Sequence, residues 1–408
     1  MSFNYENYFK SIIDEIKSEG RYRVFIDILR KSQNFPNASW FEDGKSIKED
    51  ITVWCSNDYL GMGQNPKVLE EMRKALDKCG AGSGGTRNIS GTTHYHVELE
   101  KELASLHRKD SALLFTSGYI SNEATLSTLA GSLKGCIVFS DELNHSSMIQ
   151  GIRSSGAKKV IFKHNDLEDL KNKIKQFDKS TPKLIAFESV YSMDGDIAPI
   201  VEISKIAKEN NALTYLDEVH AVGMYGKNGG GISDYLNISN EIDIIEGTLA
   251  KAYGVMGGYI TGNKYIVDTI RSYSSGFIFT TSLPPCIVAG GLASVRYLKE
   301  SDKERKKHKS IVRYLKQRLN KEGIQVIENS SHIVPVKVGN PMLCKRASDL
   351  LLSKYKIYVQ PINYPTVPRG TERLRITPTP LHTEEMADNL VESLKKVWKN
   401  LNIGSIAA

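Results

Sequence analysis

The chain has 408 residues, of which 40% are hydrophobic and 25% charged, and its formal net charge is +7. Single hydrophobic cores stop growing at roughly 250 to 300 residues, so this length predicts a large domain and a smaller one. The composition excludes disordered and fibrous proteins. No apolar run approaches the ~20 residues that cross a bilayer, and the first residues resemble neither a signal peptide nor a transit peptide, so we expect a cytoplasmic protein with no membrane partner.

The cysteines and the positive charge bear on two further classes of protein. The five cysteines lie far apart without a C-x-x-C pair, so we expect reduced thiols, no disulfide framework and no metal site. The excess of lysine comes without a nucleic-acid recognition motif, so we expect no nucleic acid partner. A basic surface suits a polyanionic small molecule such as coenzyme A equally well.

Residues 1–60 are predicted to form an N-terminal arm. Apolar residues between Phe9 and Ile16 have helical spacing, Gly20 ends the pattern, and the basic segment 21–23 follows. This pattern is typical of a helix that lies on the body of the protein.

Residues 61–295 alternate between helical patterns and short apolar runs, as parallel strands with crossover helices do. The predicted strands lie near residues 112–118, 135–141, 158–164, 183–189, 212–218 and 242–248. We therefore predict a large α/β domain with a mostly parallel central sheet. Residues 296–408 predict a smaller C-terminal α/β domain, with a Lys-rich helix, a strand pair around 332–339, strands at 357–362 and 373–379, and a last helix.

Two charged residues stand at strand ends of the predicted large domain. Asp217 closes one strand, and Lys251 follows the next one. Because strands of an open parallel sheet present ligands at their carboxyl ends, the two side chains should meet in one crevice. A lysine that forms a Schiff base and an acid that faces a pyridine nitrogen are recurrent contributions of proteins to pyridoxal phosphate chemistry. Either residue alone would be an ordinary surface charge.

Further candidates for the same site lie after other strands. His220, three residues after Asp217, can hydrogen-bond a cofactor's phenolic oxygen or cap a loop, and its spacing does not separate the two. His145 can lay its ring on a flat cofactor, although alone it would be interpreted as structural. Residues 117–119 lead from a strand into a helix, which offers free N–H groups and a positive dipole to a phosphate.

Gly80, Gly82 and Gly85 match G-x-G-x-x-G, but they follow a helical segment, whereas a dinucleotide fingerprint follows a strand. We therefore reject an NAD site. The irregular backbone expected there would expose Thr86 and Asn88 to a substrate.

Arg375 is a candidate for binding a carboxylate, because a guanidinium matches that group with two hydrogen bonds. The alternative is a surface arginine on an edge strand. The preceding loop, residues 363–372, contains prolines and a glycine and is a candidate lid over the substrate.

Taken together, these segments resemble the α-oxoamine synthase family of fold-type I pyridoxal-phosphate enzymes, and the likeness covers residues 21 to 398. It is carried by GSGGTRNISGT, HVELE, FTSGYISN, SDELNHSSMI, FESVYSMDGD, LDEVHAVGMYG, GTLAKAYG and LRITPTP. The resemblance implies an aspartate-aminotransferase-like fold with pyridoxal 5′-phosphate as the cofactor.

The resemblance also implies roles for individual residues. Lys251 would hold the cofactor through a Schiff base, Asp217 would pair with its ring nitrogen, and His145 would stack on its ring. The other implied cofactor contacts are Ser192 and His220 at the phenolic oxygen, Ser117, Gly118, Tyr119 and Thr248 at the phosphate, and Thr280 and Thr281 at the phosphate of a neighbouring subunit. The last pair implies a homodimer with its active site at the subunit interface.

Within the family, GRYRVF, Thr86 and INYPTVPRGTERLR resemble most closely the branch that condenses glycine with succinyl-CoA and forms 5-aminolevulinate, CoA and CO2, the first step of haem biosynthesis by the glycine route. The implied substrate contacts are Asn57 and Arg375 for the glycine carboxylate, Arg21, Thr86 and Asn88 for the succinyl carboxylate, and Ser140, Lys159 and Thr366 for the acyl-CoA.

Two kinds of alternative remain open from the sequence. The first is a sister enzyme, 8-amino-7-oxononanoate synthase or glycine C-acetyltransferase, although Arg21 and Thr86 favour an acyl chain that ends in a charge. The second is a non-catalytic protein that keeps the fold as a scaffold. The presence of Lys251, Asp217 and His220 argues against that scaffold.

Overall fold

The structure is a computed structural model that describes residues 3–42 and 46–404. Its contacts divide the chain into two compact units, one made of residues 57–192 and 196–306, the other of residues 1–56, 193–195 and 307–408. The sequence divides the chain after residues 60 and 295, whereas the contacts divide it after 56 and 306 and place the first segment in the same unit as the last.

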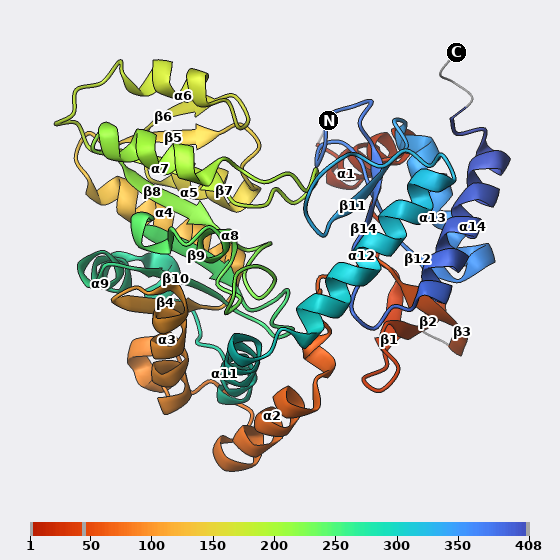
Figure 1. The fold of residues 1–408 in the computed structure, drawn as a ribbon, viewed down its shortest axis with the longest axis horizontal. Helices are drawn as coiled ribbons and strands as arrows, with labels where there is room; N and C mark the ends of the chain where they lie inside the picture. The colour runs from red at the N-terminus through yellow and green to blue at the C-terminus, as the bar shows by residue number, and fades with distance from the viewer. Residues whose placement is uncertain (1–2, 43–45, 405–408) are drawn as a thin grey trace. The chain divides into compact units, whose positions relative to one another are not determined.

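The larger unit, residues 57–192 and 196–306, contains a seven-stranded sheet in the order β4-β10-β9-β8-β7-β5-β6 (Figure 1). Its strands are β4 (Ser111–Phe115), β5 (Ile137–Asp141), β6 (Lys158–Phe162), β7 (Lys183–Glu188), β8 (Leu213–Asp217), β9 (Ile244–Thr248) and β10 (Gly258–Gly262). Strands β5 to β9 pair in parallel, and β10 is antiparallel to both of its neighbours. The predicted mostly parallel α/β sheet is confirmed.

Helices cover both faces of this sheet. The helices of the larger unit are α2 (Pro66–Cys79), α3 (His94–His107), α4 (Gly118–Ser132), α5 (Ser146–Ser154), α6 (Leu167–Ile174), α7 (Ile200–Glu209), α8 (Ile232–Tyr235), α9 (Lys264–Tyr273), α10 (Ser275–Ile278) and α11 (Pro285–Glu300), with short turns η1 (Met62–Gln64), η2 (Arg87–Gly91) and η3 (Ser239–Glu241). Alternation along β4 explains the two layers, since Leu113 and Phe115 pack with α4, α5 and α9, whereas Leu114 packs with α3 and α11.

The smaller unit has two sheets, in the orders β1-β2-β3-β12 and β11-β14-β13. Its elements are α1 (Tyr5–Ser18), β1 (Asp27–Arg30), β2 (Asn37–Glu42), β3 (Ser46–Val53), α12 (Lys303–Lys321, which begins in the larger unit), β11 (Val334–Lys337), α13 (Pro341–Tyr355), β12 (Ile357–Tyr358), β13 (Gln360–Ile362), β14 (Arg373–Ile376) and α14 (Glu384–Leu401). Two predictions are wrong here. Residues 357–362 are two strands in different sheets, and 332–339 holds one strand whose partner is β14.

The ring of Tyr259 lies so close to the backbone of β9 that only glycine fits at position 247. A Cβ atom there would lie 2.5 Å from the ring of Tyr259, which is fully buried and shares a 2.9 Å hydrogen bond with His107. The tyrosine therefore cannot move aside without losing its partner.

We expect Gly247→Ala to lower the free energy of unfolding by about 1–3 kcal/mol, because it overpacks a filled core. Urea denaturation of the cofactor-free protein measures this. Gly82→Ala, where a Cβ meets nothing within 4 Å, is the matched control and should change stability by about 0.5 kcal/mol or less. Equal stability of the two variants would contradict this account of β9.

Candidate active site

Three acidic residues lie side by side on three neighbouring strands of the large sheet, at or near the carboxyl end of each strand. Glu188 on β7, Asp217 on β8 and Glu246 on β9 are partners in register, and at most 4% of each is exposed. Parallel pairing puts the carboxyl ends of strands at one edge, so the sheet itself brings these groups together. A lysine follows the third strand. The predicted meeting of Asp217 with Lys251 follows from this topology.

Next to this edge lies a cavity of about 150 Å³. The residues that line it are Gly118, Tyr119, Asn122, His145, Ser147, Glu188, Asp217, Val219, His220, Thr248 and Lys251. Both members of the predicted pair, both predicted histidines and three residues of the predicted phosphate site are therefore together. Cavities that combine convergent polar groups with titratable residues are the default location of an active site.

The amine of Lys251 is 2.8 Å from Nε2 of His220. Nδ1 of that histidine is 2.9 Å from the hydroxyl of Tyr59, which is fully buried and in turn donates to Oδ1 of Asn57 over 3.3 Å. Both ring nitrogens of His220 thus have side-chain partners, which explains its position without a role in capping a loop. Tyr59 was not predicted from the sequence, because it precedes the strands of the sheet and does not follow a strand end as the predicted residues do.

Asp217 accepts a hydrogen bond on each carboxylate oxygen, from Nδ2 of Asn122 and from the backbone N–H of Val219, both over 2.8 Å. Oδ1 of Asn122 accepts from the hydroxyl of Tyr215, also over 2.8 Å. Two N–H donors stabilise an ionised carboxylate inside the protein. Asn122 is a second residue that the sequence analysis missed, because it lies on a helix face within the segment assigned to phosphate binding.

His145 begins α5 and is held from two sides. Its Nδ1 is 2.7 Å from Oγ of Ser147, and its backbone N–H donates to Oε1 of Glu188 over 2.6 Å. Burial lowers the pKa of His145, the charge of Asp217 opposes this shift and that of Lys251 adds to it. A neutral, fixed imidazole at the wall of the cavity is suited to contact a flat ring.

The N-terminus of α4 forms the other end of the cavity. Ser117 is the N-cap and accepts from the backbone N–H of Ile120 over 3.3 Å. Gly118 opens the helix, and a Cβ there would lie 3.4 Å from the side chain of Thr248, so its small size keeps the first turn open. Free N–H groups and the helix dipole at such a terminus favour an anion. Ser117 itself does not line the cavity.

These residues fit pyridoxal 5′-phosphate. The cavity offers an amine at Lys251, a hydrogen-bonded carboxylate at Asp217, a flat neutral ring at His145 and a helix terminus for a phosphate. The ring nitrogen of the cofactor requires an acid, whereas its phosphate requires N–H donors. Different elements of the fold supply these two kinds of group.

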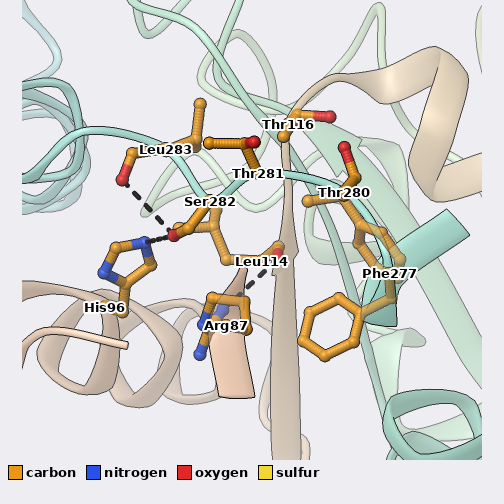
Figure 2. Close-up of a pocket in the computed structure, with 10 residues that line it drawn as sticks. Arg87, His96, Leu114, Thr116, Phe277, Thr280, Thr281, Ser282 and Leu283 are labelled. Atoms are coloured by element: carbon orange, nitrogen blue, oxygen red, sulfur yellow. Dashed lines mark hydrogen bonds between the residues drawn. The ribbon is translucent and has the colours of Figure 1, made fainter. Parts of the chain in front are cut away.

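Thr280 and Thr281 lie elsewhere in the larger unit, around a second cavity of only about 10 Å³ (Figure 2). Thr281 forms a bridge with Thr86, whose hydroxyl donates to Oδ1 of Asn88 over 2.7 Å. The structure therefore brings the residues predicted for the succinyl carboxylate beside those predicted for a neighbouring subunit's phosphate. This juxtaposition was not predicted from the sequence.

A buried hydrogen-bonded pair holds these two segments together (Figure 2). Nε2 of His96 is 2.8 Å from Oγ of Ser282, which also donates to the carbonyl of Gly91 over 2.8 Å. The backbone N–H of Ser282 donates to the carbonyl of Gly85 over 2.9 Å. Burial and the nearby charge of Arg87 lower the pKa of His96 to about 4, so the ring is neutral at physiological pH.

The remaining predicted substrate residues are distributed over both units. Arg21 and Thr366 belong to the smaller unit, where Arg21 forms an ion pair with Glu19 and its guanidinium lies 5.4 Å from the ring of Tyr364. Arg375 is 7% exposed on β14, the middle strand of its sheet, so the alternative of a surface residue on an edge strand is wrong.

In the larger unit, Lys159 is exposed on β6, whereas Ser140 is buried on β5 and its hydroxyl accepts from Nδ2 of Asn144 over 2.9 Å. Ser192 follows β7 and does not line the 150 Å³ cavity. The roles proposed for these three residues stay predictions.

The described residues were also compared with the requirements of a membrane-spanning helix and of a metal site. Within residues 3–42 and 46–404, no helix is long and apolar enough to cross a membrane, and no group of three or more His, Cys, Asp or Glu side chains is placed to hold a metal ion. All five cysteines lie within these ranges and are free thiols.

Comparison with known proteins identifies the family to which the chain belongs. Residues 49–394 match the profile of aminotransferase class I and II. The chain is 58% identical to 5-aminolevulinate synthase of Rhizobium meliloti (strain 1021), over 99% of this chain and 100% of that one, and 57% identical to 5-aminolevulinate synthase 1 of Cereibacter sphaeroides, over 97% and 98%. A solved serine palmitoyltransferase from S. paucimobilis with bound PLP and myriocin is similar with a TM-score of 0.89 at 30% identity, over 98% and 100% of the two chains.

We expect His96 to destabilise the fold as the solution becomes acidic. Its pKa is about 4 in the fold against 6.5 ordinarily, so the unfolded chain takes up the proton first, and stability is lost as the pH falls from 6.5 toward 4. His96→Gln removes this titration and should retain on the order of 2 kcal/mol more of its neutral-pH stability at pH 4.5 than the unchanged protein does. Urea midpoints at pH 7 and 4.5 measure this.

The exposed neighbour on the same helix provides the control. His94→Gln should follow the pH dependence of the unchanged protein, because His94 is exposed. If His96→Gln and the unchanged protein lost stability equally between the two pH values, the neutral buried state of His96 would be refuted.

Proposed function

The chain belongs to the 5-aminolevulinate synthases within the aminotransferase class I and II family, and from this premise we propose how its residues condense glycine with succinyl-CoA to give 5-aminolevulinate, CoA and CO2. This reaction is the first step of haem biosynthesis by the glycine route. The observation that carries the assignment of residues is the pairing of Lys251 with Asp217 in one buried cavity.

Bound pyridoxal phosphate supplies an electron sink for the electrons released when a bond to the glycine α-carbon breaks. Asp217, fixed by Asn122 and Val219, keeps the ring nitrogen protonated. Lys251 binds the cofactor and afterwards carries the proton between solvent and the glycine α-carbon. His220 lies within hydrogen-bond distance of the Lys251 amine and therefore orients it. His145, held by Ser147 at the wall of the cavity, would cover one face of the ring and exclude water there.

Two arginines give the substrates their orientation in this proposal. Arg375 holds the glycine carboxylate together with Asn57, because a buried guanidinium binds a carboxylate with two hydrogen bonds. Arg21, with Thr86 and Asn88, receives the terminal carboxylate of the succinyl group. In the structure Arg21 pairs with Glu19, so the substrate carboxylate takes the place of an internal one.

The acyl-CoA is further contacted by Ser140, Lys159 and Thr366 in this proposal. The hydroxyl of Thr366 accepts from Nη2 of Arg23 over 3.1 Å, which places a second cation next to it. A phosphate-rich ligand benefits from such cations. Closure of the loop at residues 363–372 over the substrates is part of the same proposal.

We further propose a homodimer that works in the cytoplasm. Ser192 contacts the phenolic oxygen of the cofactor, and Thr280 and Thr281 reach the phosphate of the neighbouring subunit. The dimer is supported by the position of the two threonines away from the cavity that holds Lys251. The cytoplasm is supported by the five free thiols, which suit a reducing compartment.

Product formation from glycine tests the proposed selectivity. Purified protein should form 5-aminolevulinate with succinyl-CoA and at least about 100-fold less aminoketone with acetyl-CoA, because acetyl-CoA has no terminal carboxylate to bind Arg21. Arg21→Leu should raise KM for succinyl-CoA about tenfold or more and leave KM for glycine within about twofold.

The control for this experiment is Arg30→Leu, an exposed arginine at the end of β1, which should leave both constants unchanged. Preference for acetyl-CoA by the unchanged protein would move the chain to a sister branch of the family. An equal effect of both arginine variants would refute the role of Arg21.

A further inference from the structure

The active-site edge of the sheet holds more acid than the proposed reaction uses. Glu246 is fully buried beside Asp217, yet it does not line the cavity. Its Oε1 accepts a 2.5 Å hydrogen bond from Oγ of Ser121 on the first turn of α4. Its Oε2 has no hydrogen-bond partner among the described residues. A buried carboxylate with so little support is costly if it carries a charge.

The two neighbouring acids differ in their hydrogen bonds. Asp217 accepts one N–H donor on each oxygen, whereas Glu246 accepts a single hydroxyl on one oxygen. Two adjacent buried carboxyl groups do not both ionise, and the proton stays on the one whose charge is less well stabilised. Counting the donors therefore assigns the charge to Asp217 and the proton to Glu246.

The charged and titratable groups around Glu246 agree with this assignment. Asp217 and Tyr215 face it from β8, Tyr259 from β10, and Lys251 from the segment after β9. Burial raises the pKa of Glu246 well above its ordinary value and the charge of Asp217 raises it further, whereas the hydrogen bond from Ser121 and the charge of Lys251 oppose the shift.

Glu246 also connects the two ends of the cofactor site. Ser121, its hydrogen-bond partner, precedes Asn122, the partner of Asp217, on the same turn of α4. A Cβ at Gly118, where a phosphate would bind, would lie 3.5 Å from Oε1 of Glu246. An ionised Glu246 would therefore repel a phosphate dianion at the start of α4, and a neutral one does not.

We propose that Glu246 is a neutral carboxylic acid that positions Asp217 and the first turn of α4 as one unit, so that a cofactor's ring nitrogen meets the only ionised member of this acid pair and its phosphate meets no buried negative charge. The positioning role rests on the proposed function, whereas the neutral state concerns the protein by itself. The two parts are therefore tested separately.

The neutral state is tested on the cofactor-free protein with Glu246→Gln. If Glu246 keeps its proton in the fold, the unfolded chain releases that proton as the pH rises above about 4.5, and the unchanged protein loses stability that the variant retains. The unfolding constant of Glu246→Gln relative to the unchanged protein should fall by up to about tenfold per pH unit between pH 5 and the folded pKa.

An exposed glutamate on α7, Glu202, provides the matched control. Glu202→Gln should show no such growing difference, because the side chain of Glu202 is exposed to solvent in the fold. A constant ratio of unfolding constants for Glu246→Gln across pH 5 to 8, or a ratio that changes in the opposite direction, would overturn the neutral state.

The positioning role is tested by binding of pyridoxal phosphate. Glu246→Gln keeps a neutral group of the same shape that accepts from Ser121, so the Kd should stay within about threefold. Glu246→Ala removes this hydrogen bond and the packing beside Asp217, and it should raise Kd about tenfold and shift the pH at which the bound cofactor's absorption changes. Loss of binding in Glu246→Gln as large as in Glu246→Ala would overturn the proposal.

The two experiments distinguish a failure of the proposed function from a failure of the neutral state of Glu246. Failure of the unchanged protein to bind pyridoxal phosphate at all would contradict the proposed function and with it the positioning role. The pH dependence of the cofactor-free Glu246→Gln variant decides the neutral state independently of that result.

Discussion

The parallel pairing of β7, β8 and β9 is the constraint on which the rest of the site depends. It places three acids, Glu188, Asp217 and Glu246, side by side in a buried layer. Such an arrangement is unfavourable unless protons, N–H donors or cations compensate it. Ser121 and Asn122 of α4 and the backbone N–H groups of His145 and Val219 supply the donors, and Lys251 supplies the cation. The same donors and the same lysine that form the cofactor site therefore also compensate the buried acids of this sheet edge.

The parts of the fold that could be predicted are those with a repeating local pattern. The six apolar runs between residues 112 and 248 became β4 to β9, because a strand buried on both faces, as all of these except the edge strand β6 are, is apolar almost throughout. Strand β10 was missed, because it follows the glycines at 254 and 257, itself begins and ends with glycine, and pairs antiparallel in the sheet's interior. The run at 357–362 looked continuous, and only tertiary pairing divides it between two sheets.

The site was predictable to the extent that its residues close strands. Asp217 closes β8 and Lys251 follows β9, and the same reasoning applied to every strand would have found Glu188, which closes β7. Glu246 lies in the middle of β9, and only the pairing of β8 with β9 places it beside Asp217. Asn122 and Tyr59 were beyond reach, because they act from a helix turn and from a segment far away in sequence. The bridge between Thr86 and Thr281 likewise depends on contacts that no local pattern encodes.

The central claim is that Lys251, held opposite Asp217 and beside His220, is the residue that binds pyridoxal phosphate. Borohydride reduction of the purified protein with this cofactor, followed by mass spectrometry of its peptides, tests the claim most directly. The account predicts a phosphopyridoxyl group on the peptide that contains Lys251 and on no other in stoichiometric amount. A stoichiometric modification on a different lysine, or an unmodified Lys251 peptide, would contradict it.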